Sequence, residues 1–227
     1  MEMFIDGAWI AAKSGATDPV MDPSTSEIFD TVPSADASDA DTAINAAQAA
    51  FLDWSQRTMA ERVAVLKACG KAMLENAELL GAALHRELGR PLAGCIAEIK
   101  SSAALLDIYT EEGLRLHGEM PIATGAGERT IVTREPVGVV VAITPFNFPI
   151  TLLMFKVGAA LTAGCTVVAK PSEDTPTSTL LLAEIFHKAG LPKGAFNVVT
   201  GAGSGVGEAY EAVSSAEDLV SNSLHGS

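Results

Sequence analysis

An asparagine between two prolines is the first residue whose setting suits chemistry. Asn147 lies in the sequence Pro-Phe-Asn-Phe-Pro at residues 145–149, directly after the apolar run 137–144. The prolines restrict the backbone on both sides, so the Asn147 amide can place an N–H where negative charge develops on a carbonyl oxygen. Asparagine is also common in ordinary turns. The residues alone therefore leave two interpretations open, an oxyanion donor and a turn asparagine.

A second polar segment follows the next apolar run. The sequence Lys-Pro-Ser-Glu at residues 170–173 comes directly after residues 165–169. Open α/β sheets bind ligands at the carboxyl ends of their strands. In dinucleotide-binding sheets, an acidic group at this position accepts hydrogen bonds from the ribose hydroxyls of the adenosine. Glu173 would do so, and Lys170 would add a donor. The charge of Glu173 repels a 2′-phosphate and favours NAD over NADP, although Lys170 could attract the same phosphate. A solvated polar turn is the alternative interpretation.

Glycines and cysteines give weaker signals. The glycines at positions 201, 203, 205 and 207 do not form the pattern GxGxxG. They also follow the third predicted strand, residues 196–199, whereas a dinucleotide fingerprint follows the first strand. A flexible loop is the alternative there. No cysteine has a histidine or carboxylate base beside it in the sequence, so we expect each thiol to pack as a small apolar group. These cysteines are Cys69, Cys95 and Cys165.

Composition excludes several classes of partner. The net charge of −13 argues against nucleic acid and anionic membranes. No apolar run reaches the ~18 residues of a membrane span, and the start of the chain lacks the pattern of a signal peptide. The four histidines show no metal-ligand spacing, so we expect no metal site. Three cysteines without CxxC spacing indicate reduced thiols and a cytoplasmic protein.

The elements that must position these residues begin with a hairpin and helices. Asp6-Gly7 predicts a turn within a hairpin over residues 4–10. Ser38 and Asp41 have the spacing of a capping box at a helix start. Apolar residues then recur at helical spacing from Met59 to Leu88, which predicts one long helix that ends at Gly89. A further helix is expected from Pro91 to Tyr109.

The pattern then changes to an alternation of strands and helices. Strands are expected over 137–144, 165–169 and 196–199. Helices are expected over 150–163 and from Thr175-Pro176 to Ala189, with Gly164 and Gly190 just beyond their ends. Such an alternation predicts a parallel sheet with right-handed crossovers.

These segments resemble the front half of the nicotinamide-binding domain of the aldehyde dehydrogenase superfamily. The resemblance covers residues about 4 to 221 and rests on a colinear set of motifs. These are Arg-Glu-Pro-Val-Gly at 134–138, the asparagine motif, Lys-Pro-Ser-Glu, Ala-Gly-Leu-Pro at 189–192 and Asn-Val-Val-Thr-Gly at 197–201. With Phe146 at its second position, the asparagine motif resembles that of the lactaldehyde, semialdehyde and non-phosphorylating glyceraldehyde-phosphate dehydrogenase branches of the family.

The resemblance implies an α/β fold with an N-terminal helical layer and a partial Rossmann-like parallel sheet. Residues 1–117 would form the hairpin and the helical part of the cofactor domain, and residues 118–136 a strand of the oligomerisation arm. Residues 137–221 would form the parallel βαβαβ nicotinamide-binding unit. Residues 222–227 would be a divergent tail.

The resemblance also implies roles for individual residues. Asn147 would be catalytic, because in the family this asparagine polarises the aldehyde oxygen and stabilises the tetrahedral oxyanion. The cofactor would be NAD, with NADP as the alternative. It would be bound by Thr144, Pro145, Phe146, Asn147, Lys170, Ser172, Glu173, Gly203 and Gly207. The full-length form would oxidise a small aldehyde to a carboxylic acid as a homo-oligomer.

No segment resembles the nucleophilic cysteine or the general-base glutamate of the family. We therefore expect a truncated or partial form that is inactive as this chain alone. The alternative is a catalytically inactive nucleotide-binding or scaffold protein derived from the same fold.

Overall fold

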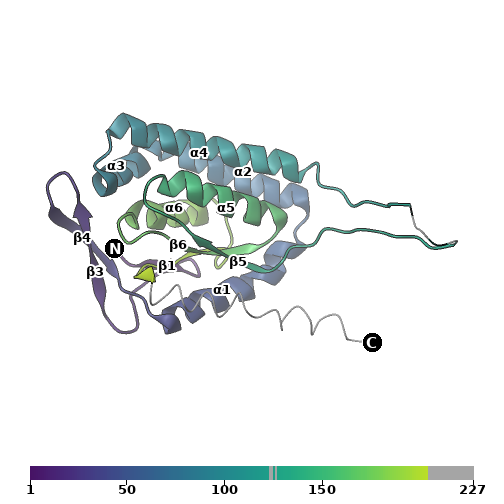
Figure 1. Ribbon diagram of the computed structural model, residues 1–227, viewed down its shortest axis with the longest axis horizontal. Coiled ribbons are helices and arrows are strands. Elements are labelled where there is room, and N and C mark those ends of the chain that lie inside the picture. Colours follow the sequence, from purple (N-terminus) through teal and green to yellow (C-terminus); the bar gives the residue numbers. More distant parts are fainter. Residues whose placement is uncertain (123–124, 126, 204–227) are drawn as a thin grey trace.

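The computed structural model describes residues 1–122, 125 and 127–203. Helices cover both faces of a five-stranded sheet (Figure 1). The strands are β1 (Met3–Ile5), β2 (Ala8–Ile10), β3 (Thr17–Asp22), β4 (Glu27–Pro33), β5 (Val139–Ile143), β6 (Thr166–Lys170) and β7 (Phe196–Val198). The helices are α1 (Ala37–Gln56), α2 (Met59–Glu75), α3 (Ala77–Leu88), α4 (Leu92–Gly113), α5 (Pro149–Ala163) and α6 (Thr177–Lys188).

The predicted parallel unit is confirmed. The main sheet has the strand order β2-β1-β7-β6-β5, and β5, β6 and β7 pair in parallel. Every residue of β6 is buried, which explains why its sequence reads as a continuous apolar run. Helix α5 ends at Gly164, whose φ of 95° lies in the left-handed region that glycine adopts readily.

The N-terminal hairpin forms as predicted and also extends the main sheet. Asp6 and Gly7 have φ angles of 51° and 76°, as a tight hairpin turn requires. Strand β1 then pairs antiparallel with β7 through Phe4 and Val198. The backbone N–H of Asp6 donates to Asn197 Oδ1 at 3.0 Å. The first strand of the chain therefore completes the sheet built by residues 139–198.

The prediction of one long helix over 59–88 is wrong. The helix breaks at Asn76 into α2 and α3, and the Asn76 side-chain amide donates to the Ala72 carbonyl at 2.8 Å. The two helices nevertheless share one apolar face, because Met73 and Leu80 on either side of the break are fully buried. Helices α2, α3 and α4 form a layer outside α5 and α6 (Figure 1).

Helix α1 covers the opposite face of the sheet. The predicted capping box of Ser38 and Asp41 is wrong, since Asp36 and Asp39 form it at the same spacing two residues earlier. Near the other end of the helix, Trp54 is fully buried and its indole N–H donates to the Leu161 carbonyl at 3.0 Å. This contact joins α1 to α5.

Between α4 and β5 the chain leaves the body as a long arm of two extended segments (Figure 1). The segments meet at one antiparallel bridge between Glu119 and Val132. Ile122 is 98% exposed and Ile131 is 70% exposed. The arm occupies the predicted region 118–136. The predicted tail 222–227 and the end of the βαβαβ unit lie outside the described residues. No helix in the described part of the chain is long and apolar enough to cross a membrane.

Candidate active site

Parallel pairing brings the two predicted motifs to one edge of the sheet. Ile143 lies beside Lys170 at the carboxyl ends of β5 and β6. The backbone N–H of Thr144 donates to the Lys170 carbonyl at 3.1 Å, which extends the pairing by one residue. The loops that carry Asn147 and Glu173 therefore leave the sheet side by side, where α/β folds place their ligand sites.

Asn147 lies in the turn that leads into α5. The helix begins at Pro149 with Phe148 as its N-cap residue, and the Phe148 carbonyl accepts the N–H of Leu152 at 2.9 Å. The Asn147 side chain is exposed and forms no hydrogen bond to any described residue. Its amide is therefore free to donate to a ligand beside the positive end of the α5 dipole.

The second loop is tied to the glycine segment that follows β7. Glu173 Oε1 accepts the backbone N–H of Gly203 at 2.9 Å. Partial burial acts to raise the pKa of Glu173, but backbone N–H groups and Lys170 outweigh it and lower that pKa. The carboxylate is therefore charged at neutral pH. Gly203 thus reaches the predicted site, while Gly207 lies outside the described residues.

Lys170 and Ser172 form contacts within their own loop. Lys170 is buried, and its Nζ donates to the Pro171 carbonyl at 3.1 Å. Burial lowers the pKa of Lys170, against the opposing effect of Glu173. Ser172 Oγ accepts the N–H of Asp174 at 3.3 Å. The contact of Lys170 with a ribose remains a prediction.

The edge offers space and unpaired polar groups to a dinucleotide. A cavity of about 280 Å³ adjoins it, lined in part by Phe146, Glu173 and Asp174. Thr144 Oγ1 is buried and has no hydrogen-bond partner among the described residues. An unsatisfied buried hydroxyl is costly, so a ligand at this edge would gain a ready partner. The residues present therefore fit a polar cofactor.

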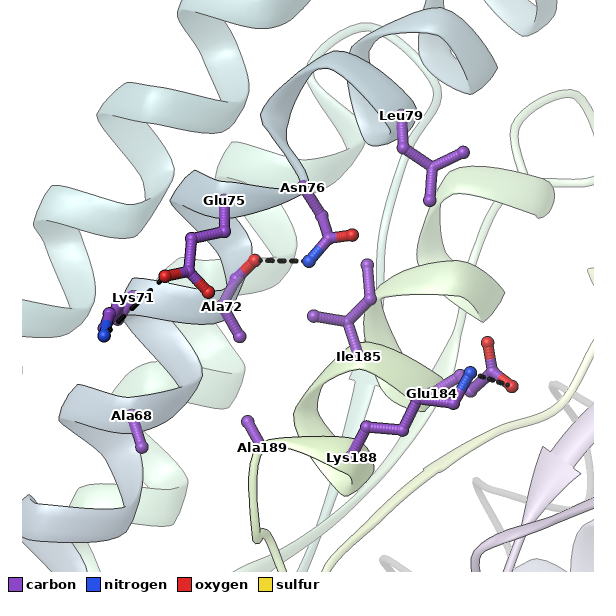
Figure 2. A pocket seen from close by; sticks show the side chains of 10 residues that line it. All are labelled: Ala68, Lys71, Ala72, Glu75, Asn76, Leu79, Glu184, Ile185, Lys188 and Ala189. Atoms are coloured by element: carbon purple, nitrogen blue, oxygen red, sulfur yellow. Dashed lines mark hydrogen bonds and ion pairs between the residues drawn. The ribbon is translucent and has the colours of Figure 1, made fainter.

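A second cavity lies away from this edge. It measures about 380 Å³ and is lined by α2, the start of α3 and the C-terminal end of α6 (Figure 2). Its polar groups are paired with each other, as in the contacts Lys71–Glu75 and Lys188–Glu184. Helix α6 runs antiparallel to the strands, so its C-terminal end marks the amino edge of the sheet. This cavity has no connection with the predicted site residues.

The sequence interpretation missed two buried glutamates that hold the site helices. Glu87 of α3 accepts the backbone N–H groups of Thr177 and Ser178 at the start of α6. Burial raises the pKa of Glu87 to about 7, against the opposing effect of these hydrogen bonds. Glu98 of α4 accepts the N–H groups that follow Pro149 at the start of α5. A sequence signal was available, because Glu87 continues the apolar spacing of Leu80 and Leu84.

The cysteines are buried, as predicted. Burial raises the pKa of Cys69 to about 12 and also raises the pKa of Cys95. Cys165 is buried directly before the first residue of β6, at the amino edge of the sheet. Cys69 lies against the Phe186 carbonyl near the C-terminal end of α6, away from Asn147. Cys95 lies nearer to Asn147, because its Sγ contacts the carbonyl of Arg90, whose guanidinium lies over Phe148. Within the described ranges, no group of side chains is arranged to hold a metal ion.

Comparison with known proteins identifies relatives over most of the chain. The sequence model described as the aldehyde dehydrogenase family matches residues 9–220. A glutarate-semialdehyde dehydrogenase of Pseudomonas aeruginosa is 41% identical over 206 residues, which are 91% of this chain and 43% of that protein. A succinate-semialdehyde dehydrogenase of Escherichia coli K12, whose name specifies NADP(+), is 39% identical over the same shares.

Solved structures agree with the sequence relatives. A succinate-semialdehyde dehydrogenase from Burkholderia pseudomallei aligns with a TM-score of 0.89 and 41% identity, over 92% of this chain and 43% of its own. A betaine aldehyde dehydrogenase from Staphylococcus aureus, solved in complex with NAD+, aligns with a TM-score of 0.86 and 32% identity, over 91% and 43%. The chain thus spans less than half the length of these relatives.

Proposed function

The chain belongs to the aldehyde dehydrogenase family, and we propose that it is the part of an NAD(P)-dependent enzyme that binds the cofactor and supplies an oxyanion donor. The reaction would oxidise a small aldehyde to a carboxylic acid. One observation carries this proposal: Asn147, whose amide has no hydrogen-bond partner among the described residues, and a charged Glu173 follow strands that end at the same carboxyl edge of a parallel sheet. Relatives named for semialdehydes, NAD+ and NADP(+) support it.

Asn147 would act on the aldehyde oxygen. When a nucleophile adds to the carbonyl carbon, negative charge develops on that oxygen, and the Asn147 N–H would stabilise it by hydrogen bonding. One preorganised donor of this kind contributes about 3–4 kcal/mol to a transition state. A bound nicotinamide supplies the hydride acceptor. The residues proposed to hold the cofactor are Thr144, Pro145, Phe146, Asn147, Lys170, Ser172, Glu173, Gly203 and Gly207.

The exposed arm and the buried cysteines support two further proposals, on assembly and on localisation. We propose that the arm over 118–136 joins copies of the protein, because Ile122 and Ile131 are exposed on it and apolar groups gain by burial between subunits. We also propose a cytoplasmic setting, since the three cysteines are free. The same thiols also support the alternative function, a nucleotide-binding protein without its own catalysis, because a buried thiol is a poor nucleophile.

Replacing Glu173 with alanine should weaken NAD binding by about 1–3 kcal/mol, because hydrogen bonds to a charged group are lost. The lower end of this range is expected, since Glu173 is exposed and solvent screens its charge. NADP binding should weaken less or become stronger. Calorimetric titration of both nucleotides measures the difference. Glu173→Gln is the matched control, because it keeps an acceptor for the Gly203 N–H. Equal losses for the two nucleotides would remove Glu173 from the ribose site.

The purified chain alone should not oxidise aldehydes. An oxyanion donor lowers a barrier only when a nucleophile is in place, and burial keeps the thiols of Cys69 and Cys95 protonated. NADH formation from a panel of short aldehydes is the measurement, with Cys165→Ser as the control variant. Turnover that disappears in Cys165→Ser would contradict the proposal and assign catalysis to that thiol.

A further inference from the structure

We propose that Arg90 and Glu98 form a positioning pair that fixes the turn from which the Asn147 amide projects. The inference rests on the proposed role of Asn147 as an oxyanion donor. Neither residue is offered as a catalytic residue, because their contacts reach Asn147 through its neighbours in the chain.

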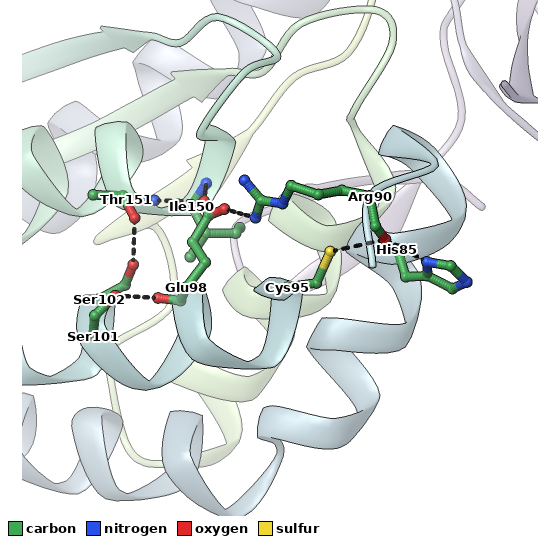
Figure 3. A network of polar contacts seen from close by, with 8 residues as sticks. All are labelled: His85, Arg90, Cys95, Glu98, Ser101, Ser102, Ile150 and Thr151. Carbon is green, nitrogen blue, oxygen red and sulfur yellow. Dashed lines mark hydrogen bonds and ion pairs between the residues drawn. The ribbon is translucent and has the colours of Figure 1, made fainter. Parts of the chain in front are cut away.

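The first contact of the pair is with the backbone that follows Asn147. Helix α5 has no side-chain cap of its own, since Phe148 occupies the N-cap position and Pro149 the first turn. The next two N–H groups, of Ile150 and Thr151, donate to Glu98 Oε1 at 3.1 Å and 3.2 Å (Figure 3). Glu98 is buried. The Glu98 carboxylate of α4 therefore caps α5 in place of a side chain from α5 itself, and it fixes where α5 begins.

The second contact is with the side chain that follows Asn147. Arg90 pairs with the other carboxylate oxygen, Glu98 Oε2. Its guanidinium also lies over the Phe148 ring, 4.9 Å from the ring centre. Such a cation–π contact favours this orientation of the ring. Backbone and side chain directly after Asn147 are thus fixed by one ion pair.

The pair is itself held in place. The Arg90 carbonyl accepts a hydrogen bond from His85 Nδ1, and Cys95 Sγ lies 3.7 Å from the same carbonyl oxygen (Figure 3). One turn beyond Glu98, the hydroxyls of Ser102 and Thr151 lie 3.0 Å apart. The ion pair of Arg90 and the buried Glu98 therefore differs from a mobile ion pair on the surface. Loss of either Arg90 or Glu98 leaves the charge of the other uncompensated.

The neighbouring helix provides a matched control. Glu87 caps α6 as Glu98 caps α5, and α6 also lacks a side-chain cap of its own. Among the described residues, however, Glu87 has no ion-pair partner, and no arginine stacks on the loop before α6. Substitution of Glu87 therefore tests a buried helix cap alone, whereas substitution of Glu98 tests a cap with the ion pair and the stacked ring.

The experiment is nuclear magnetic resonance on the ¹⁵N-labelled full chain. The side-chain NH₂ signals of Asn147 are identified by their loss in Asn147→Ala. In Glu98→Gln the acceptor for Ile150 and Thr151 remains but the ion pair is lost, so the Asn147 signals should shift and broaden while those two amides exchange at nearly unchanged rates. In Glu98→Ala both should change, with amide exchange about 10-fold faster or more. Arg90→Lys, which keeps the charge, should restore part of the wild-type Asn147 signal relative to Arg90→Met.

Two results would overturn the inference. One is an Asn147 signal that is the same in Glu98→Gln, Arg90→Met and wild type. The other is an equal change in Glu87→Gln, which would indicate general loosening of the fold. Titration of the wild-type chain with NAD is a separate test. Failure to bind NAD would count against the proposed function, while the Asn147 signals would still decide the positioning role.

Discussion

Replacing Glu87 with glutamine should stabilise the protein at pH 8 by about 3 kcal/mol and have little effect at pH 4. Burial raises the pKa of Glu87 in the folded state to about 7, from the 4.5 of an exposed glutamate. In the unfolded chain the carboxyl group loses its proton near pH 4.5. The folded state holds that proton more tightly, so this residue favours folding most below pH 4.5, and its contribution is lost as pH rises through 7.

Glutamine isolates this effect because it cannot ionise and keeps an oxygen for the Thr177 and Ser178 N–H groups. Its NH₂ group has acceptors nearby, since Thr177 Oγ1 and Ser178 Oγ are buried without partners among the described residues. Urea unfolding of both proteins at pH 4, 5, 6, 7 and 8 gives the free energy of unfolding. Only the difference between them is informative, because carboxylates with lowered pKa, such as Glu184, favour folding at higher pH. Parallel pH profiles would contradict the prediction.

Replacing Trp54 with alanine should lower the free energy of unfolding by about 3–5 kcal/mol. The indole is fully buried between α1 and α5, so its removal leaves a large cavity. It also leaves the Leu161 carbonyl without its donor. Such a loss is a large fraction of the stability of a typical domain.

Two further variants divide this effect into its parts. Trp54→Phe keeps most of the apolar volume and removes the hydrogen bond, so it should cost about 1–2 kcal/mol. Leu52→Ala, at an exposed position of the same helix, should change stability by less than about 0.5 kcal/mol. Urea unfolding at pH 7 measures all three. A loss in Trp54→Ala no larger than that in Leu52→Ala would show that α1 does not contribute to the cooperative core.

The sheet unit from β5 to β7 could be predicted because its signals are local. Valine-rich runs mark the strands, and Gly164 and Pro149 mark the ends of α5. The break at Asn76 could not be predicted, because the apolar spacing passes through it without a change of phase. The helix start at Asp36 was missed because Ser38 offered the same three-residue spacing as an alternative cap.

For the candidate site, the sequence predicted the two loops that meet at one edge of the sheet. Asn147 and Glu173 follow strands directly, so their meeting at one edge follows from parallel pairing. The supports of those loops could not be predicted, since Glu87 and Glu98 act on helices about 90 and 50 residues later in the chain. An acidic residue on the apolar face of a helix was the signal that distinguished them from surface glutamates.

The position of β1 affects how the protein folds during synthesis. Asp6 and its partner Asn197 are separated by 191 residues. At a synthesis rate of about 5–20 residues per second, β1 leaves the ribosome roughly 10–40 s before the strand it pairs with. Until then Met3, Phe4 and Ile5, all buried in the finished sheet, have no place to pack beside β7. The pairing of β1 with β7 can therefore form only after residues 196–198 have left the ribosome.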